Sequence, residues 1–216
     1  MKSVLVIGMG RFGKHLSKKM QELGNDVMII DKDEELISEF ASDFTDSQIG
    51  DCRVEGVLQS LGINNFDICF VAIGEDFQAS LEITALLKDL NAKWVVTKAR
   101  SDIQKNLLKR IGADEVVYPE RDTAEKLAIR YNAKNIFDYI QLTPEYSIYE
   151  IPIMNLWVGK NMSDLGIRKK YKVNIIAIKN ENILDPMPSP NYVFRENDHI
   201  IVIGKSSDVF KLTSLT

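Results

Sequence analysis

Three glycines near the start of the chain, Gly8, Gly10 and Gly13, have the spacing G-x-G-x-x-G. The first allows a tight turn, the second lets the backbone approach a phosphate, and the third lets a helix pack closely on a strand. The apolar residues 4–7 predict a buried parallel strand before the turn, and residues 14–23 carry apolar side chains at helical spacing after it. A helix that begins here would offer free backbone N–H groups and a partial positive charge to an anion.

An acidic residue follows the next predicted strand. This strand, residues 25–30, ends at Asp31, about 20 residues beyond the glycines. A carboxylate at this place can accept hydrogen bonds from ribose hydroxyls. The glycine pattern alone is weak support, because a glycine turn also occurs in α/β domains that bind nothing there. The strand, the helix and the acid together favour a nucleotide site over such a turn.

The elements that would position these residues alternate along the first part of the chain. Strands are predicted at 4–7, 25–30, 47–49, 67–73, 94–97 and 115–118, and helices at 14–23, 33–42, 53–61, 77–90 and 102–110. This alternation predicts an α/β fold with a Rossmann-like, doubly wound parallel sheet, in which ligands lie beyond the carboxyl ends of the strands. A further predicted helix, 119–130, begins at Pro119 and could pack on its own sheet or on a second subunit.

Near residue 140 the pattern changes. The later predicted elements are a strand with one solvated face at 146–154, helices at 163–170 and 206–212, and strands at 173–178 and 199–203. A proline-rich loop separates the last two strands. We therefore predict two domains, residues 1–140 and residues 141–216. The second is a smaller α+β domain that dimerisation would stabilise.

Composition excludes several classes of protein. The 216-residue chain has a formal net charge of -4, so no strong basic field favours nucleic acid as a partner. No apolar run approaches the roughly 20 residues that a membrane-spanning helix needs. Cys52 and Cys69 lack the spacing of a metal site and give no disulfide framework. These features lead us to expect a cytoplasmic protein.

Residues for catalysis are few. The chain has two histidines, His15 in the first turn after the glycines and His199 in an apolar strand. It has no P-loop lysine followed by serine or threonine, no G-x-S-x-G and no H-E-x-x-H. The small second domain would hardly hold a substrate together with a catalytic set. We therefore expect a nucleotide sensor and no enzyme.

Several segments resemble the RCK (regulator of K⁺ conductance) family. They are GMGRFG at 8–13, the acid at 31, VAIGEDFQAS at 71–80, KAR at 98–100 and IGADEVVYPERDTAEKLA at 111–128. The resemblance covers the whole chain, with residues 1 to about 140 similar to the N-terminal RCK domain and the remainder similar to the RCK C-terminal domain. Within the family, the chain looks most like the cytosolic gating subunits of the bacterial Ktr and Trk potassium uptake systems.

The resemblance implies an assembly and a partner. Homodimers would assemble into an octameric ring, which would dock on a membrane K⁺-translocating subunit of the KtrB or TrkH type. ATP would favour the conducting form and ADP the closed form. The protein would then be cytoplasmic and peripheral to the inner face of the cell membrane, where this partner holds it.

The family's nucleotide-binding positions can be transferred to this sequence. They are Gly8, Met9, Gly10, Arg11, Phe12, Gly13, Asp31, Lys32, Asp33, Asp51, Cys52, Ile73, Gly74, Glu75, Lys98, Ala99, Arg100 and Glu120. By resemblance, Arg11 contacts a γ-phosphate across the dimer. Glu120 lies near the phosphates and helps to hold a divalent cation, Mg²⁺ or Ca²⁺.

The identity of the nucleotide stays open at this point. ATP, ADP, NAD and NADH all present a ribose and a pyrophosphate, so the glycine pattern does not separate them. The positions of Arg11 and Glu120 favour a triphosphate with a cation. An NAD(H)-sensing regulator is the alternative, and a Rossmann oxidoreductase is disfavoured because the catalytic set is missing.

A second ligand is expected in the C-terminal domain. Residues 162–176 and the loop that ends at Pro190 resemble the segment where some Gram-positive relatives bind cyclic di-AMP. Arg168 would pair with a phosphate and Asn174 would hydrogen-bond an adenine edge, while the apolar walls would be Met162, Ile167, Ile175 and Pro190. The alternative is that Ile175 is a core residue, Arg168 a solvated charge, and the segment only a dimer contact.

Overall fold

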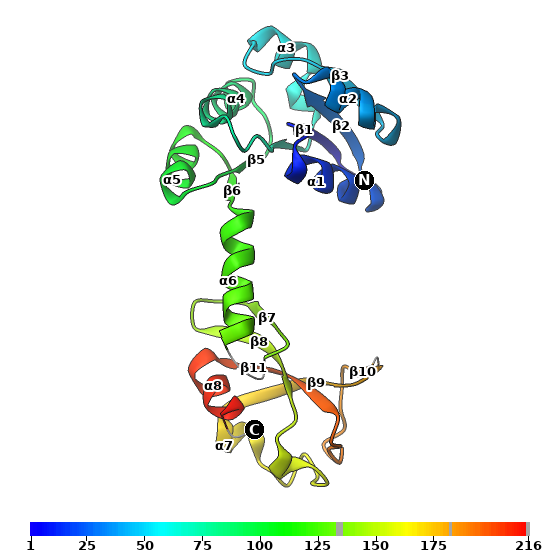
Figure 1. Ribbon diagram of the computed structural model, residues 1–216, viewed down its shortest axis with the longest axis vertical. Helices are drawn as coiled ribbons and strands as arrows, with labels where there is room; N and C mark the ends of the chain where they lie inside the picture. Colours follow the sequence, from blue (N-terminus) through cyan, green and yellow to red (C-terminus); the bar gives the residue numbers. More distant parts are fainter. Residues whose placement is uncertain (133–135, 182, 215–216) are drawn as a thin grey trace. The chain divides into compact units, whose positions relative to one another are not determined.

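The computed structural model describes residues 1–132, 136–181 and 183–214. The chain divides into two compact units, Met1–Arg121 and Asp122–Thr216 (Figure 1), and each is described here by itself. The helix α6 (Pro119–Asn132) contains this division. The domain boundary expected between residues 140 and 141 stays a prediction. No helix among the described residues is both long enough and apolar enough to cross a membrane.

The first unit is built on a six-stranded parallel sheet, as the sequence predicts. Its strands are β1 (Ser3–Ile7), β2 (Asp26–Asp31), β3 (Asp46–Ile49), β4 (Ile68–Val71), β5 (Val95–Lys98) and β6 (Glu115–Val117). Their order is β3-β2-β1-β4-β5-β6, which is that of a doubly wound Rossmann-type sheet. The order reverses beside β1, because β2 and β4 lie on its two sides. A crevice for ligands is expected at the carboxyl end of β1.

Helices cover both faces of this sheet. They are α1 (Arg11–Glu22), α2 (Glu34–Phe40), α3 (Glu55–Leu61), α4 (Phe77–Asp89) and α5 (Asp102–Ile111). Alternate residues of β1 point to opposite faces, so Val4 packs in the cluster that includes Ile37 of α2. Leu5 packs in the other cluster, with Leu58 of α3 and Leu87 of α4. Burial on both faces explains why the segments of β1, β2 and β4 read as largely continuous apolar runs.

Side-chain caps fix where three of these helices begin. The Asp33 carboxylate accepts hydrogen bonds from the backbone N–H groups of Glu35 and Leu36 at the start of α2. Asp76 accepts from Ala79 N at 2.9 Å at the start of α4. The Ser101 hydroxyl accepts from Gln104 N at the start of α5. Each cap follows a strand end, so the helices begin directly at the edge of the sheet where ligands bind.

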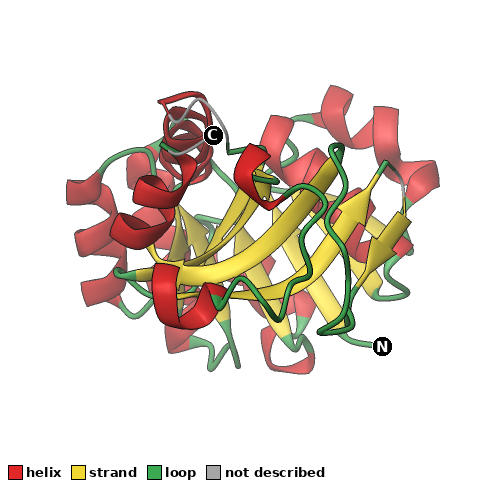
Figure 2. Cartoon of the chain, turned by 90° about the horizontal axis from the view of Figure 1, so that it is seen from below, coloured by secondary structure: helices red, strands yellow, loops and turns green. Residues whose placement is uncertain are grey.

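The second unit holds a five-stranded antiparallel sheet, shown with its strands in yellow in Figure 2. Its strands are β7 (Asp138–Gln141), β8 (Tyr146–Pro152), β9 (Val173–Asn180), β10 (Ile183–Asp185) and β11 (Asp198–Lys205), in the order β10-β9-β11-β8-β7. Short helices α7 (Ile167–Tyr171) and α8 (Ser206–Thr213) accompany it. Buried aromatic side chains of Trp157, Tyr149 and Phe194 fill its core.

Three details of this unit differ from the sequence-based expectation. The strands β7 and β10 were not predicted, and both lie at the edges of the sheet. The helix expected at 163–170 begins only at Ile167, because Gly166 takes a left-handed conformation with φ of 55° and residues 163–166 form turns. The edge strands are short, so their side-chain alternation is too brief to stand out from loops.

Candidate nucleotide-binding site

The glycine turn joins β1 to α1, and each glycine has a distinct surrounding. Gly8 has φ of +99°, a left-handed value that favours glycine. A Cβ on Gly13 would lie 1.9 Å from the carbonyl oxygen of Gly8, so α1 approaches the turn more closely than any side chain allows. A Cβ on Gly10 would meet nothing within 4 Å, and Gly10 lines the cavity described below. The turn therefore leaves open the space that a phosphate would need.

The first turn of α1 faces this space. Its N-cap position is Gly10, whose carbonyl accepts from Lys14 N at 3.0 Å, and no described side chain caps the helix. The first backbone N–H groups of a helix lack partners within the helix and carry a partial positive charge. Together with the glycine turn, these groups have the chemistry that suits an anion such as a phosphate.

Asp31 holds the glycine turn as well as ending β2. Its Oδ2 accepts from the backbone N–H of Met9 at 2.6 Å, and its Oδ1 accepts from Asp33 N at 3.0 Å. A carboxylate has about four acceptor sites, so further hydrogen bonds from ribose hydroxyls remain possible. One side chain thus fixes the glycine turn and lines the cavity described below, where it keeps acceptor capacity for a further donor.

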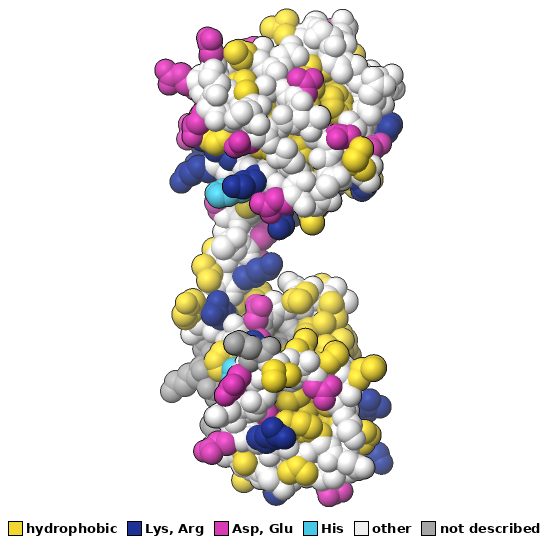
Figure 3. All heavy atoms as spheres, turned by 90° about the vertical axis from the view of Figure 1, so that its right-hand side faces the viewer, with side chains coloured by type: hydrophobic (Ala, Val, Ile, Leu, Met, Phe, Trp, Pro, Cys, Tyr) yellow, Lys and Arg dark blue, Asp and Glu magenta, His cyan; other side chains and the backbone are white. Residues whose placement is uncertain are grey.

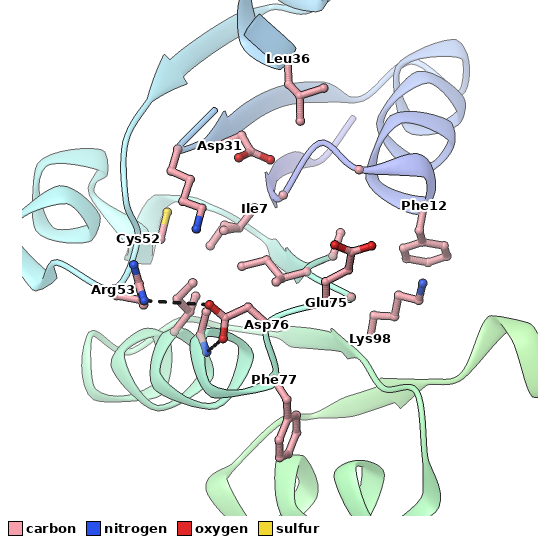
Figure 4. Close-up of a pocket in the computed structure, with 18 of the residues that line it drawn as sticks. Ile7, Phe12, Asp31, Leu36, Cys52, Arg53, Glu75, Asp76, Phe77 and Lys98 are labelled. Atoms are coloured by element: carbon pink, nitrogen blue, oxygen red, sulfur yellow. Dashed lines mark hydrogen bonds and ion pairs between the residues drawn. The ribbon is translucent and has the colours of Figure 1, made fainter. Parts of the chain in front are cut away.

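A cavity of about 640 Å³ lies at the carboxyl ends of these strands, within the size range of ligand pockets. Most of the predicted residues line it: Gly8, Gly10, Arg11, Phe12, Asp31, Lys32, Asp51, Cys52, Ile73, Gly74, Glu75, Lys98, Arg100 and Glu120. Figure 4 shows Phe12 and Lys98 at one end and Cys52 and Arg53 at the other. The structure thus brings together segments that are far apart in the sequence.

Four predicted residues do not line the cavity. Met9 is fully buried, and its sulfur accepts a hydrogen bond from the Ser17 hydroxyl at 3.8 Å. Gly13 packs against the turn, and Asp33 caps α2. Ala99 is fully buried beside β6, where its N–H donates to Val117 O. These residues shape the site from behind and do not face it.

One end of the cavity carries cationic side chains near the glycine turn. Lys98 Nζ lies 2.7 Å from Glu120 Oε1 and 5.6 Å from the centre of the Phe12 ring. The hydrogen bond from Lys98 lowers the pKa of Glu120, which is ionised at neutral pH. Arg100 Nη1 donates to the carbonyl of Gly74 at 3.3 Å. These cations and the exposed Arg11 suit the charge of a phosphate chain.

The opposite end is dominated by a pair that the sequence did not predict. Arg53 donates to Asp51 through Nη2 at 2.7 Å and through Nε at 3.1 Å. Hydrogen bonds from Arg53 hold the pKa of Asp51 at about 2. Burial raises the pKa of the neighbouring Cys52 to about 12, so its thiol is protonated and apolar in character. The Asp51 carboxylate and the Arg53 guanidinium group thus form an ion pair at this end, and Asp76 Oδ2 lies 3.9 Å from Arg53 Nη1.

Nine further lining residues were missed: Ile7, Leu36, Gly50, Arg53, Ala72, Asp76, Phe77, Ala79 and Ile83. Most are apolar residues of buried strands and helix faces, whose sequence pattern is that of ordinary core. Arg53 and Asp76 each follow a predicted strand end by a few residues, and that placement was the signal available. Their mutual approach depends on the packing of α4 beside the β3 loop.

The residues expected to bind cyclic di-AMP lie in the second unit. Arg168 donates to Asn174 Oδ1 through Nη2 at 2.6 Å, so these two side chains are neighbours. Ser163 N donates to the carbonyl of the exposed Pro190 at 2.9 Å, which brings the loop beside Met162. Ile167 is buried in the core of the unit, and Ile175 and Met162 pack against that core. Arg168 and Asn174 therefore meet at an exposed position, and the assignment of this segment to cyclic di-AMP stays a prediction.

Glu120 does not belong to a ready-made metal site. Among the residues that the structure describes, no group of three or more His, Cys, Asp or Glu side chains could hold a metal ion. Glu120 instead pairs with Lys98. A cation held by Glu120 would therefore need ligands from phosphates or from a second subunit.

The fold and this cavity define a two-domain protein with a Rossmann-type nucleotide site. Residues 4–119 match the TrkA-N domain family and residues 146–215 match the TrkA-C domain family. The chain belongs to this TrkA-N and TrkA-C family of RCK proteins.

Named relatives are potassium uptake proteins. The Ktr system potassium uptake protein C of Bacillus subtilis (strain 168) is 40% identical over 208 residues, which cover 96% of this chain and 94% of that protein. Protein A of the Ktr system of the same organism is 36% identical, with the same coverage. The chain is thus similar over nearly its whole length to components of a potassium uptake system.

Solved structures show the same fold. The GsuK channel bound to NAD has a TM-score of 0.69 and 17% identity, and the match covers 96% of this chain and 38% of that chain. A structure of GsuK bound to ADP matches 62% of this chain and 35% of that chain, with a TM-score of 0.55 and 15% identity. At these identities the likeness confirms the Rossmann-like sheet and the second smaller domain.

We expect Gly10→Ala and Gly13→Ala to fail in different ways. A methyl group at Gly10 meets open space, so the protein should fold with an unfolding temperature near that of the wild type, but lose nucleotide affinity at least tenfold. A methyl group at Gly13 would collide with the Gly8 carbonyl, so it should lower the unfolding temperature by several degrees or prevent folding. Calorimetry and thermal unfolding measure the two effects. Tight nucleotide binding by Gly10→Ala would contradict the phosphate position.

Proposed function

We propose that this protein is a cytosolic regulatory subunit that binds ATP and ADP and gates a membrane K⁺-translocating subunit of the KtrB or TrkH type. The observation that carries the proposal is the cavity at the glycine turn, with Arg11, Lys98 and Arg100 at its phosphate end. The similarity to Ktr potassium uptake proteins supports the link to potassium transport. The proposed assembly is a homodimer that forms an octameric ring.

The choice between ATP or ADP and NAD(H) rests on charge. Three cations and a helix N-terminus converge near the glycine turn, which suits the charge of a triphosphate. GsuK is named in structures with NAD and with ADP, so relatives of this fold take both kinds of ligand. An NAD(H)-sensing regulator is therefore the second candidate.

A sensor fits the site better than an enzyme does. The described residues that line the cavity include no histidine, and the Cys52 thiol has a raised pKa, so it is a poor nucleophile. His199, in the second unit, hydrogen-bonds through Nδ1 to Glu150 at 2.9 Å and stacks on Phe137. Binding rather than turnover is the activity that we propose.

The second unit has surface that association could cover. Exposed apolar side chains include Leu127, Tyr131, Ile140, Leu142 and Tyr146. Figure 3 shows hydrophobic side chains, in yellow, gathered on the visible face of this unit. A dimer is the proposed form that buries apolar surface of this kind.

Gating requires that the nucleotides discriminate between two shapes of the assembly. ATP and ADP must bind the conducting and closed forms with different affinities, because a ligand of equal affinity shifts no equilibrium. The γ-phosphate is the chemical difference between ATP and ADP. Residues that contact it are therefore the proposed origin of the signal.

We expect Arg11→Ala to weaken ATP binding about tenfold or more and ADP binding less, because only ATP has the γ-phosphate that a charge-assisted hydrogen bond would recognise. Asp31→Ala should weaken ATP, ADP and NAD alike, since all three share a ribose. Lys18→Ala, a cation of the same helix outside the cavity, is the matched control. Calorimetry with each nucleotide measures the effects. Equal losses of ATP and ADP in Arg11→Ala would remove the γ-phosphate assignment.

We propose that Glu120 helps to hold a Mg²⁺ or Ca²⁺ ion at the nucleotide in the dimer. In Glu120→Gln, the response of K⁺ flux to added Mg²⁺ in the presence of ATP should be reduced, because an amide is a weaker ligand for a hard cation. Glu115→Gln, an exposed acid of β6, is the control. Reconstituted uptake by the wild type and both variants is the measurement. Identical responses in all three would exclude the role.

We also propose that cyclic di-AMP binds at the C-terminal domains, with Arg168 pairing with a phosphate. A two-fold symmetric ligand suits a site that two copies share across a dimer axis. Arg168 and Asn174 lie side by side, where a charged group and an amide could meet a phosphate and an adenine edge.

Titration of the full chain with cyclic di-AMP should give one ligand per two chains. Arg168→Ala should abolish this binding while leaving ATP binding intact, and Lys211→Ala of α8 should bind as the wild type does. Calorimetry in the presence of ATP separates the two sites. No heat with an intact dimer at micromolar ligand would contradict the site.

A further inference from the structure

Arg53 occupies the end of the cavity that lies opposite Phe12 and Lys98 (Figure 4). It follows β3 in the loop that contains Asp51 and Cys52, and its side chain is 38% exposed. Phosphates would lie at the other end, at the glycine turn and the first turn of α1. Arg53 is therefore placed away from the part of a nucleotide that usually attracts arginine.

The nitrogen atoms of the Arg53 guanidinium group lie close to two carboxylates, those of Asp51 and Asp76. Asp51 accepts from Nε at 3.1 Å and from Nη2 at 2.7 Å, and Asp51 Oδ1 also accepts from the backbone N–H of Arg53 at 3.0 Å. On the other side, Nη1 lies 3.9 Å from Asp76 Oδ2. Asp76 is itself fixed, because its Oδ1 caps α4 through Ala79 N. Because N–H groups of a guanidinium donate along its plane, the bidentate hydrogen bonds to Asp51 do not use its flat faces.

The surroundings of Arg53 suit a nucleobase. Asp31 marks the position of the ribose at the end of β2, and β3 is the next strand of the sheet on the side away from β1. The walls nearby include Cys52 with its protonated thiol and the helix residues Ala79 and Ile83. A base linked to a ribose at Asp31 would thus lie at the same end of the cavity as Arg53, where it could contact these apolar side chains.

We propose that Arg53 is a specificity-determining residue that stacks its guanidinium plane on a purine ring, with Asp51 and Asp76 fixing the orientation of that plane. The inference rests on the proposed nucleotide binding and extends it to the base. Arginine stacks on aromatic faces through a planar, delocalised cation, which the point charge of lysine does not reproduce. A purine offers a larger face than a pyrimidine, so the site should prefer ATP to UTP and CTP.

The test compares Arg53→Met, which keeps the length of the side chain without its plane and charge, with Arg53→Lys, which keeps the charge alone. Both should bind ATP, ADP and NAD about tenfold more weakly, by the same factor for each ligand, since stacking does not depend on the phosphates. The preference for ATP over UTP should fall in both variants. Arg110→Met, the same substitution in the last turn of α5, should bind as the wild type does. Thermal unfolding without ligand checks that each variant is folded.

The outcomes separate this inference from the proposed function. If the wild type binds no adenine nucleotide, the proposed function fails and the stacking role fails with it. If the wild type binds ATP and a folded Arg53→Met binds ATP equally well, only the stacking role fails. A loss confined to ATP would assign Arg53 to phosphate contacts, and full affinity in Arg53→Lys would show that charge alone matters. Either result overturns the proposal.

Discussion

The close approach of α1 to the end of β1 is the constraint on which the nucleotide site depends. The α-carbon of Gly13 is so near the Gly8 carbonyl that a Cβ would lie 1.9 Å from its oxygen. This contact directs the first turn of α1 at the cavity, and the Asp31 carboxylate fixes the same turn through Met9 N. The glycine turn, the carboxyl end of β2 and the reversal of the strand order all meet at this point of the sheet.

Much of the fold was predictable because the spacing of apolar residues and the residues typical of turns and helix caps indicated the same strands and helices. Most of the parallel strands of the first unit follow apolar runs, although β3 has the sequence DSQI, and the helices follow 3.6-residue patterns with capping residues such as Asp33. The strands β7 and β10 were not predictable in the same way, since short edge strands carry little alternation. The helix α7 begins later than predicted because Gly166 has a positive φ, a backbone conformation that the helical spacing of apolar residues does not reveal.

The candidate site was predictable where the chemistry is local and less so where it depends on packing. The glycines, Arg11 and Asp31 come from a contiguous strand–turn–helix–strand segment, so their proximity follows from one motif. Arg53 and Asp76 belong to different crossovers and meet only because α4 begins beside the β3 loop. Met9 and Ala99 belong to the segments that resemble the family, but both are fully buried, a difference that the sequence pattern does not reveal.

The pair between Lys98 and Glu120 links the cavity to the helix that leaves the first unit. Lys98 is only 11% exposed and stands over the Phe12 ring, whereas Glu120 belongs to the first turn of α6. A phosphate oxygen that reached Lys98 would compete with Glu120 for a single ammonium group. If the proposed triphosphate reached Lys98 in this way, the Glu120 carboxylate would lose its partner at the first turn of α6, and departure of the phosphate would restore the pair. An exchange of partners at one lysine would thus convert the length of a phosphate chain into the loss or gain of an ion pair at the start of a helix.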